Sequence, residues 1–115
     1  MIFMTLAMLA QPVVGATPHD VTVPNAIVGL HNEYARCQDQ NFDPQRVRSR
    51  ETFVAEVERQ IAACASQKAV LKQRAEAVLA GNSEYRDPAV RAHAIAEAFD
   101  GLDRSRRLMA RAPSR

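Results

Sequence analysis

Residues 49–81 read SRETFVAEVERQIAACASQKAVLKQRAEAVLAG, and this stretch decides the fold class. Its apolar residues recur at alternating steps of four and three, which keeps one seam on one side of a helix. The two heptad positions hold Val54, Ile61, Lys68 and Ala75, and Val57, Cys64, Leu71 and Val78. The pattern predicts a long central helix over about 50–80, with Ser49 as its N-cap and Gly81 as a left-handed residue after its end. Other helices must cover a seam of this length, so we expect an all-α protein.

Two further helices are predicted, one on each side of the long helix. Apolar residues that step by three, four and three predict a helix over about 25–40; they are Ile27, Leu30, Tyr34 and Cys37. The pair Asp87-Pro88 is typical of an N-cap and first helical position, and it opens a helix that runs to about residue 109. Together the three helices predict a small antiparallel three-helix bundle or a helical hairpin.

The first residues are typical of a secretory signal peptide. An apolar run, MIFMTLAMLA, leads to Val14-Gly15-Ala16, a small-residue site of the kind that signal peptidase cuts. No Lys or Arg precedes the run, so a buried N-terminal helix is the alternative. The predicted organisation is a signal peptide over 1–16, an extended spacer over 17–24, a helical domain over 25–110 and a frayed tail over 111–115. We therefore expect a periplasmic or secreted protein.

Cys37 and Cys64 are the only cysteines, and an even number in an exported chain predicts a disulfide. Both lie on predicted apolar seams, so facing helices would bring the sulfurs together. A helix that began at Pro44 would carry Cys64 about 30 Å along its axis, too far for a tight hairpin to close the bond. We therefore expect residues 41–49 to double back and the long helix to begin after Ser49. Intermolecular pairing is the alternative.

Little in the sequence predicts chemistry. The sequence lacks the CxxC, HExxH and GxSxG motifs and a glycine-rich phosphate loop. His93 and Glu97 share a helix face and would make half of a metal site, but a surface pair is the simpler interpretation. We expect no enzyme activity, no metal and no other cofactor. We also expect no nucleic-acid partner, because the basic residues are not interleaved with aromatic ones.

Two surfaces are candidates for binding. The first predicted helix is about half as long as the second, which leaves part of the long helix for a partner protein or a second copy of the chain. This candidate surface consists of Val70, Leu71, Val78 and Leu79. The second surface is the basic C-terminal helix, where Arg104, Arg107 and Arg111 would meet an anion or, more weakly, a membrane surface. The expected function is therefore a structural or protein-interaction module, with anion or membrane-surface binding as the alternative.

A third basic group lies just before the long helix. Arg46, Arg48 and Arg50 alternate with other residues, so they do not share one helix face. A loop would be able to present all three to an anion. A solvated connector is the simpler interpretation.

Overall fold

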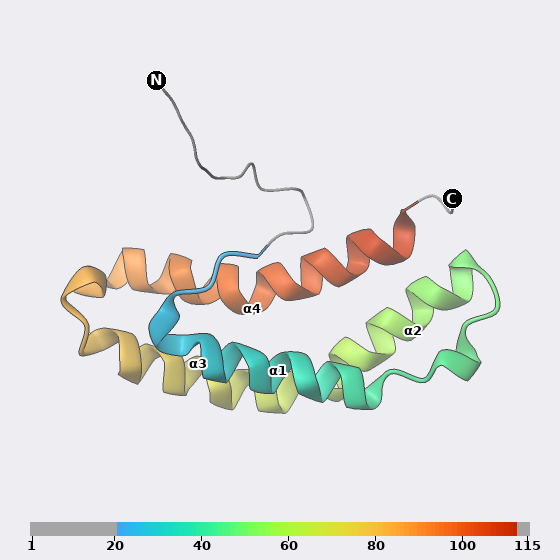
Figure 1. The fold of residues 1–115 in the computed structure, drawn as a ribbon, viewed down its shortest axis with the longest axis horizontal. Coiled ribbons are helices and arrows are strands. Elements are labelled where there is room, and N and C mark those ends of the chain that lie inside the picture. The colour runs from blue at the N-terminus through green and yellow to red at the C-terminus, as the bar shows by residue number, and fades with distance from the viewer. Residues whose placement is uncertain (1–20, 113–115) are drawn as a thin grey trace, which may run out of the picture.

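The computed structural model describes residues 21–112, and this part of the chain contains helices and their connections but no strand (Figure 1). The predicted all-α class is confirmed. The predicted signal peptide, the first half of the predicted spacer (17–20) and the last three residues lie outside the described residues. The elements in chain order are η2 (Asn25–Ile27), α1 (Val28–Asn41), η3 (Pro44–Arg46), α2 (Arg50–Ala63), α3 (Ala65–Ala80), η4 (Ser83–Tyr85) and α4 (Pro88–Arg111).

The longest helix, α4, is the element against which the others are arranged. The turn around η4 reverses the chain, so α3 and α4 run antiparallel, while α1 packs against α3 (Figure 1). In the same view α2 departs from the line of α3 and rises towards the C-terminal end of α4. As a result, α3 covers the N-terminal half of α4 and α2 covers its C-terminal half.

The prediction of a single helix over 50–80 is wrong, because the chain breaks into α2 and α3 at Cys64. At this residue φ is −105° and ψ is 11°, and its backbone N–H donates to the Ile61 carbonyl at 3.1 Å. No Gly or Pro lies between Arg50 and Ala80, so the local sequence does not require the break. Cys64 is fully buried and covalently tied to α1. Tertiary contacts therefore decide where the helix bends.

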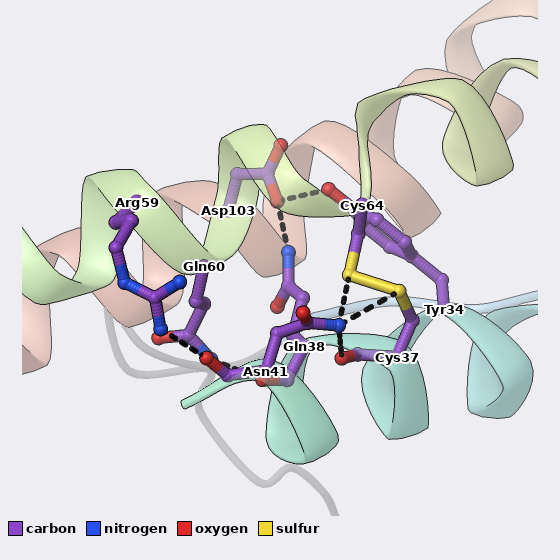
Figure 2. Close-up of a disulfide and its surroundings, with 8 residues drawn as sticks. All are labelled: Tyr34, Cys37, Gln38, Asn41, Arg59, Gln60, Cys64 and Asp103. Atoms are coloured by element: carbon purple, nitrogen blue, oxygen red, sulfur yellow. Dashed lines mark hydrogen bonds between the residues drawn. A yellow bond between two sulfur atoms is a disulfide. The ribbon is translucent and has the colours of Figure 1, made fainter. Parts of the chain in front are cut away.

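The predicted intramolecular disulfide is confirmed. Cys37 of α1 and Cys64 are bonded, with their Cα atoms 6.1 Å apart (Figure 2). The side-chain amide of Asn41 donates to the Cys37 carbonyl at 2.9 Å and lies 3.7 Å and 3.6 Å from the two sulfurs. The bond thus fixes the C-terminal half of α1 to the bend between α2 and α3.

The helix ends follow the sequence signals in two cases out of three. Ser49 caps α2 in a reciprocal box with Thr52, with bonds of 3.2 Å and 2.8 Å. Asp87 caps α4 by accepting from the Ala89 N–H at 2.8 Å, with Pro88 at the first position. The prediction of a left-handed Gly81 is wrong, since its φ of −85° lies in the region that any residue adopts.

The core has two parts. The larger part lies between α1, α3 and the N-terminal half of α4, and Tyr34 and Phe99 meet at its centre with ring centroids 5.8 Å apart. The smaller part joins α2 to the C-terminal half of α4 and consists of Val57, Ile61 and Ala110, with Phe53 and Val54 packed against it. The second part is small, so the α2–α4 contact leaves apolar side chains at its edge exposed to solvent.

Candidate functional site

A hollow of about 370 Å³ lies where the C-terminal end of α1, the middle of α2 and the last turns of α4 meet. Its lining is mostly apolar and comprises Asp39, Phe42, Phe53, Val57, Gln60, Arg106 and Met109. The rings of Phe42 and Phe53 meet edge to face, with centroids 6.1 Å apart. Met109 is 58% exposed, the highest value among the large apolar residues described.

A second hollow of about 550 Å³ adjoins the first, since Phe53 and Met109 line both. Its other lining residues are Val47, Arg48, Ser49, Arg50, Ala110 and Ala112. It therefore lies between the N-terminus of α2 and the C-terminus of α4. We refer to the two hollows together as the α2–α4 groove.

A buried carboxylate fixes the loop that forms one wall of the groove. Glu56 of α2 is only 2% exposed and accepts from the Asp43 backbone N–H at 2.8 Å and from Arg59 at 2.8 Å and 2.6 Å. Arg59 also donates to the Asn41 carbonyl at the end of α1. The Arg59 hydrogen bond, aided by the Asp43 N–H against the effect of burial, lowers the pKa of Glu56 to about 2. The connection that carries Phe42 is thereby held against α2.

An ion pair joins α2 to α4. Arg107 of α4 donates through Nε and Nη2 to the two oxygens of Glu58 of α2, at 2.7 Å and 3.0 Å. This planar, two-bond arrangement orients the two helices as well as attracting them. Polar contacts thus hold the Phe42 connection against α2 and join α2 to α4.

The largest buried polar cluster in the described chain lies elsewhere, around Asp103 (Figure 2). One oxygen of Asp103 accepts from the Tyr34 hydroxyl at 2.6 Å and from the Gln38 amide at 2.7 Å. The other accepts from Lys68 at 2.8 Å, and Lys68 also pairs with Asp100 at 2.6 Å. Asp103 is 3% exposed and lines neither hollow of the α2–α4 groove. The cluster has the character of a structural contact between α1, α3 and α4.

The electrostatics of the cluster agree with its closed geometry. Burial alone would lower the pKa of Lys68, but its hydrogen bonds to Asp100 and Asp103 outweigh burial and raise the pKa. Burial, followed by the hydrogen bond to Asp103, raises the pKa of Tyr34 far above its ordinary range. The tyrosine therefore remains a neutral donor and the lysine remains charged. Lys68 is the one charged residue in the predicted seam. It lies there because Asp100 and Asp103 of α4 face this part of the helix.

Sequence reasoning missed the buried polar residues, although their positions carried a signal. Asp103 follows Phe99 by four residues and Gln38 follows Tyr34 by four, so each continues a buried helix face. Gln60, which is 1% exposed, donates to the Gln38 carbonyl at 2.9 Å. A polar residue in phase with an apolar stripe is the pattern that would have identified this cluster.

The structure divides the apolar residues predicted to bind a partner. Leu71 and Leu79 are at most 1% exposed and belong to the main core. Val70 and Val78 are 46% and 43% exposed on the outer side of α3. The strip is therefore interrupted, and only the two valines are accessible in this conformation.

The three arginines predicted to bind an anion differ in their surroundings. Arg104 pairs with Glu97 at 2.9 Å, and Arg107 pairs with Glu58 as described above. Arg111 is exposed and has no carboxylate within 4.0 Å in the described part of the chain. Of the three arginines, Arg111 alone could thus bind an external anion without first giving up a carboxylate partner.

The pair predicted as half of a metal site lies at the other end of the molecule. His93 and Glu97 line a hollow of about 630 Å³ beside η2 and η4, and the Glu97 carboxylate binds Arg104. Among the residues of known placement, no group of three or more His, Cys, Asp or Glu could hold a metal ion. Over residues 21–112 no helix combines the length and apolar character needed to cross a bilayer.

The chain matches no protein-family model, no curated protein and no solved structure.

Proposed function

We propose that this chain is an exported, non-enzymatic helical protein that binds a protein partner through the α2–α4 groove. The sequence of residues 1–16 and the disulfide between Cys37 and Cys64 support export to an oxidising compartment. The observation that carries the interaction is the exposed Met109 at an apolar hollow, one wall of which Glu56 holds against α2. A fixed apolar depression with a charged rim is typical of protein-binding surfaces.

The absence of catalysis is part of the proposal. The described titratable cluster with the most contacts, around Asp103, is enclosed by helices and has each of its charges paired. The α2–α4 groove contains arginines and one aspartate but no nucleophile beside a base. Binding, not turnover, is the function that this geometry supports best.

Site-specific photo-crosslinking in the producing cells tests the proposal. A benzophenone amino acid replaces Met109 in one variant and Val70, an exposed residue on α3, in the matched control. We expect an adduct with one defined protein from position 109 and none from position 70. Adducts from position 70 alone would move the interaction to α3, and the absence of adducts from position 109 would refute the proposed groove. An adduct of twice the mass of the chain would identify the partner as a second copy.

The alternative function is binding of an anion or a membrane surface by the C-terminal helix, for which the exposed Arg111 is the supporting observation. Co-sedimentation with vesicles of phosphatidylglycerol, compared with phosphatidylcholine, distinguishes this alternative. Binding that is lost in Arg111→Glu and weakens with salt would favour it over a protein partner.

A further inference from the structure

We propose that the α2–α4 groove is specific for an acidic segment of its partner. In this arrangement a large apolar side chain enters the hollow at Phe42, Phe53 and Met109, and carboxylates beside it meet Arg48 and Arg50. The inference rests on the proposed function and adds the chemistry of the partner.

Part of the positive charge of the arginines at the groove has no counter-charge within the fold. The surrounding arginines that have a carboxylate within 4.0 Å are Arg46, Arg59, Arg106 and Arg107. Arg48 and Arg50 have none among residues 21–112, and both are exposed and line the second hollow. Of the three alternating arginines, Arg46 therefore pairs with Asp43 and Glu56, while Arg48 and Arg50 remain available to a partner.

The N-terminus of α2 adds to this positive field. Arg50 is the first residue of the helix, where the helix dipole places partial positive charge at the same edge of the groove. The single acidic residue that lines either hollow is Asp39, and Arg106 neutralises it at 2.9 Å. An acidic occupant gains attraction here, whereas a basic one meets like charge.

The shape of the groove favours a protein segment over a free amphiphile. Pockets for small molecules bury roughly 70–90% of the ligand within about 300–1,000 Å³. Both hollows fall within that range of volume, but both are open to solvent and would leave much of a small ligand uncovered. A side chain that projects from a folded or ordered partner fits such a hollow, because the partner itself covers the open side.

The test is a titration of the isotope-labelled, disulfide-bonded protein with two synthetic peptides, followed by NMR. One peptide carries Glu on both sides of a Leu-Phe pair, and the other carries Lys at each Glu position. We expect saturable shifts from the acidic peptide at Phe53 and Met109, weaker at higher salt, and at least about fivefold weaker binding of the basic peptide.

A charge-reversal pair gives the sharper result. The variant Arg48→Glu/Arg50→Glu should fold as the native protein does, because both side chains are exposed and Glu is favourable in the first turn of α2. It should reverse the preference, so that the basic peptide binds better. The matched control is Arg74→Glu/Arg86→Glu, which makes the same change in net charge at exposed arginines outside the groove. The control should retain the native preference.

The outcomes separate this inference from the proposed function. Equal binding of the two peptides, no binding of either, or a reversal in the control as large as in the test variant would each overturn the acidic specificity. A partner crosslinked at position 109 together with any of these results would leave the groove as the binding site and remove only the charge preference. Shifts confined to α3 would overturn both.

Discussion

Replacing Cys37 and Cys64 together by Ala should lower the free energy of unfolding by roughly 4 kcal/mol. The two cysteines are 27 residues apart, and closing a loop of that length removes unfolded-state entropy worth about 3.5 kcal/mol. Cys64 is fully buried, so loss of its sulfur adds a small cavity term of roughly 0.5–1 kcal/mol. Asn41 keeps its bond to the Cys37 carbonyl and loses only weak contacts with sulfur. The total free energy of unfolding of a small domain is about 5–15 kcal/mol, so this loss is a large fraction of it.

The assay is urea denaturation followed by circular dichroism at neutral pH. The double variant and the reduced native protein should both unfold at lower urea than the oxidised protein. Both should also show a larger m value, because the unfolded chain without the bond is more expanded. Reductant should not change the double variant, which is the control. An unchanged midpoint in the double variant would refute the assignment of the bond as the main constraint on the 38–63 loop.

The same variant tests what holds the bend at Cys64. A continuous helix would regain about one backbone hydrogen bond, worth roughly 1 kcal/mol. It would also remove Val57 and Ile61 from α4, and their burial is worth roughly 1.5–3 kcal/mol each. The bend should therefore persist without the disulfide. Spin labels at Glu51 and Arg111, near the adjacent ends of α2 and α4, should remain close, and a large separation would show that the disulfide alone imposes the bend.

Three further predictions concern single residues. Asp103→Asn should cost about 2 kcal/mol, because Lys68 loses one of its two carboxylate partners and keeps Asp100; adding Lys68→Met to this variant should recover part of the loss in the same urea assay, and no loss in Asp103→Asn would contradict a contribution of the buried pair. The folded pKa of Glu56 is depressed to about 2 from 4.5, so its contribution to stability is present above about pH 4.5 and is lost towards pH 2. The difference in thermal midpoint between the native protein and Glu56→Gln should thus shrink over that range, and a constant difference would contradict it. Gly81→Ala should change stability by less than about 0.5 kcal/mol, since its φ is −85° and a Cβ would lie 3.6 Å from the Val78 carbonyl; a loss of about 1 kcal/mol or more would indicate a left-handed residue.

The parts of the fold that could be predicted are those that local chemistry determines. Ser49 and Asp87 are followed by residues that complete their caps, so the starts of α2 and α4 could be read within a few residues. The disulfide followed from two seams, each carrying one cysteine. In each case the deciding residues are neighbours in sequence or share one helix face.

The break at Cys64 could not be predicted in the same way. The heptad pattern continues through this residue, and the flanking alanines favour a helix. The bend results from packing α2 on the far half of α4, a contact between segments about 50 residues apart. The α2–α4 groove was missed for the same reason, since Phe42, Phe53 and Met109 belong to three different segments and only the tertiary fold brings them together.

The contact of Asp103 with Tyr34, Gln38 and Lys68 has a consequence for the uniqueness of the fold. Helices rich in alanine present smooth surfaces that pack almost equally well when one slides along another. A slide of α1 by one turn along α4 would separate the Asp103 carboxylate from the hydroxyl and amide that bind it, and leave the charge buried with too few donors. The Asp103 carboxylate therefore selects the one alignment of the helices in which it can bind both donors of α1.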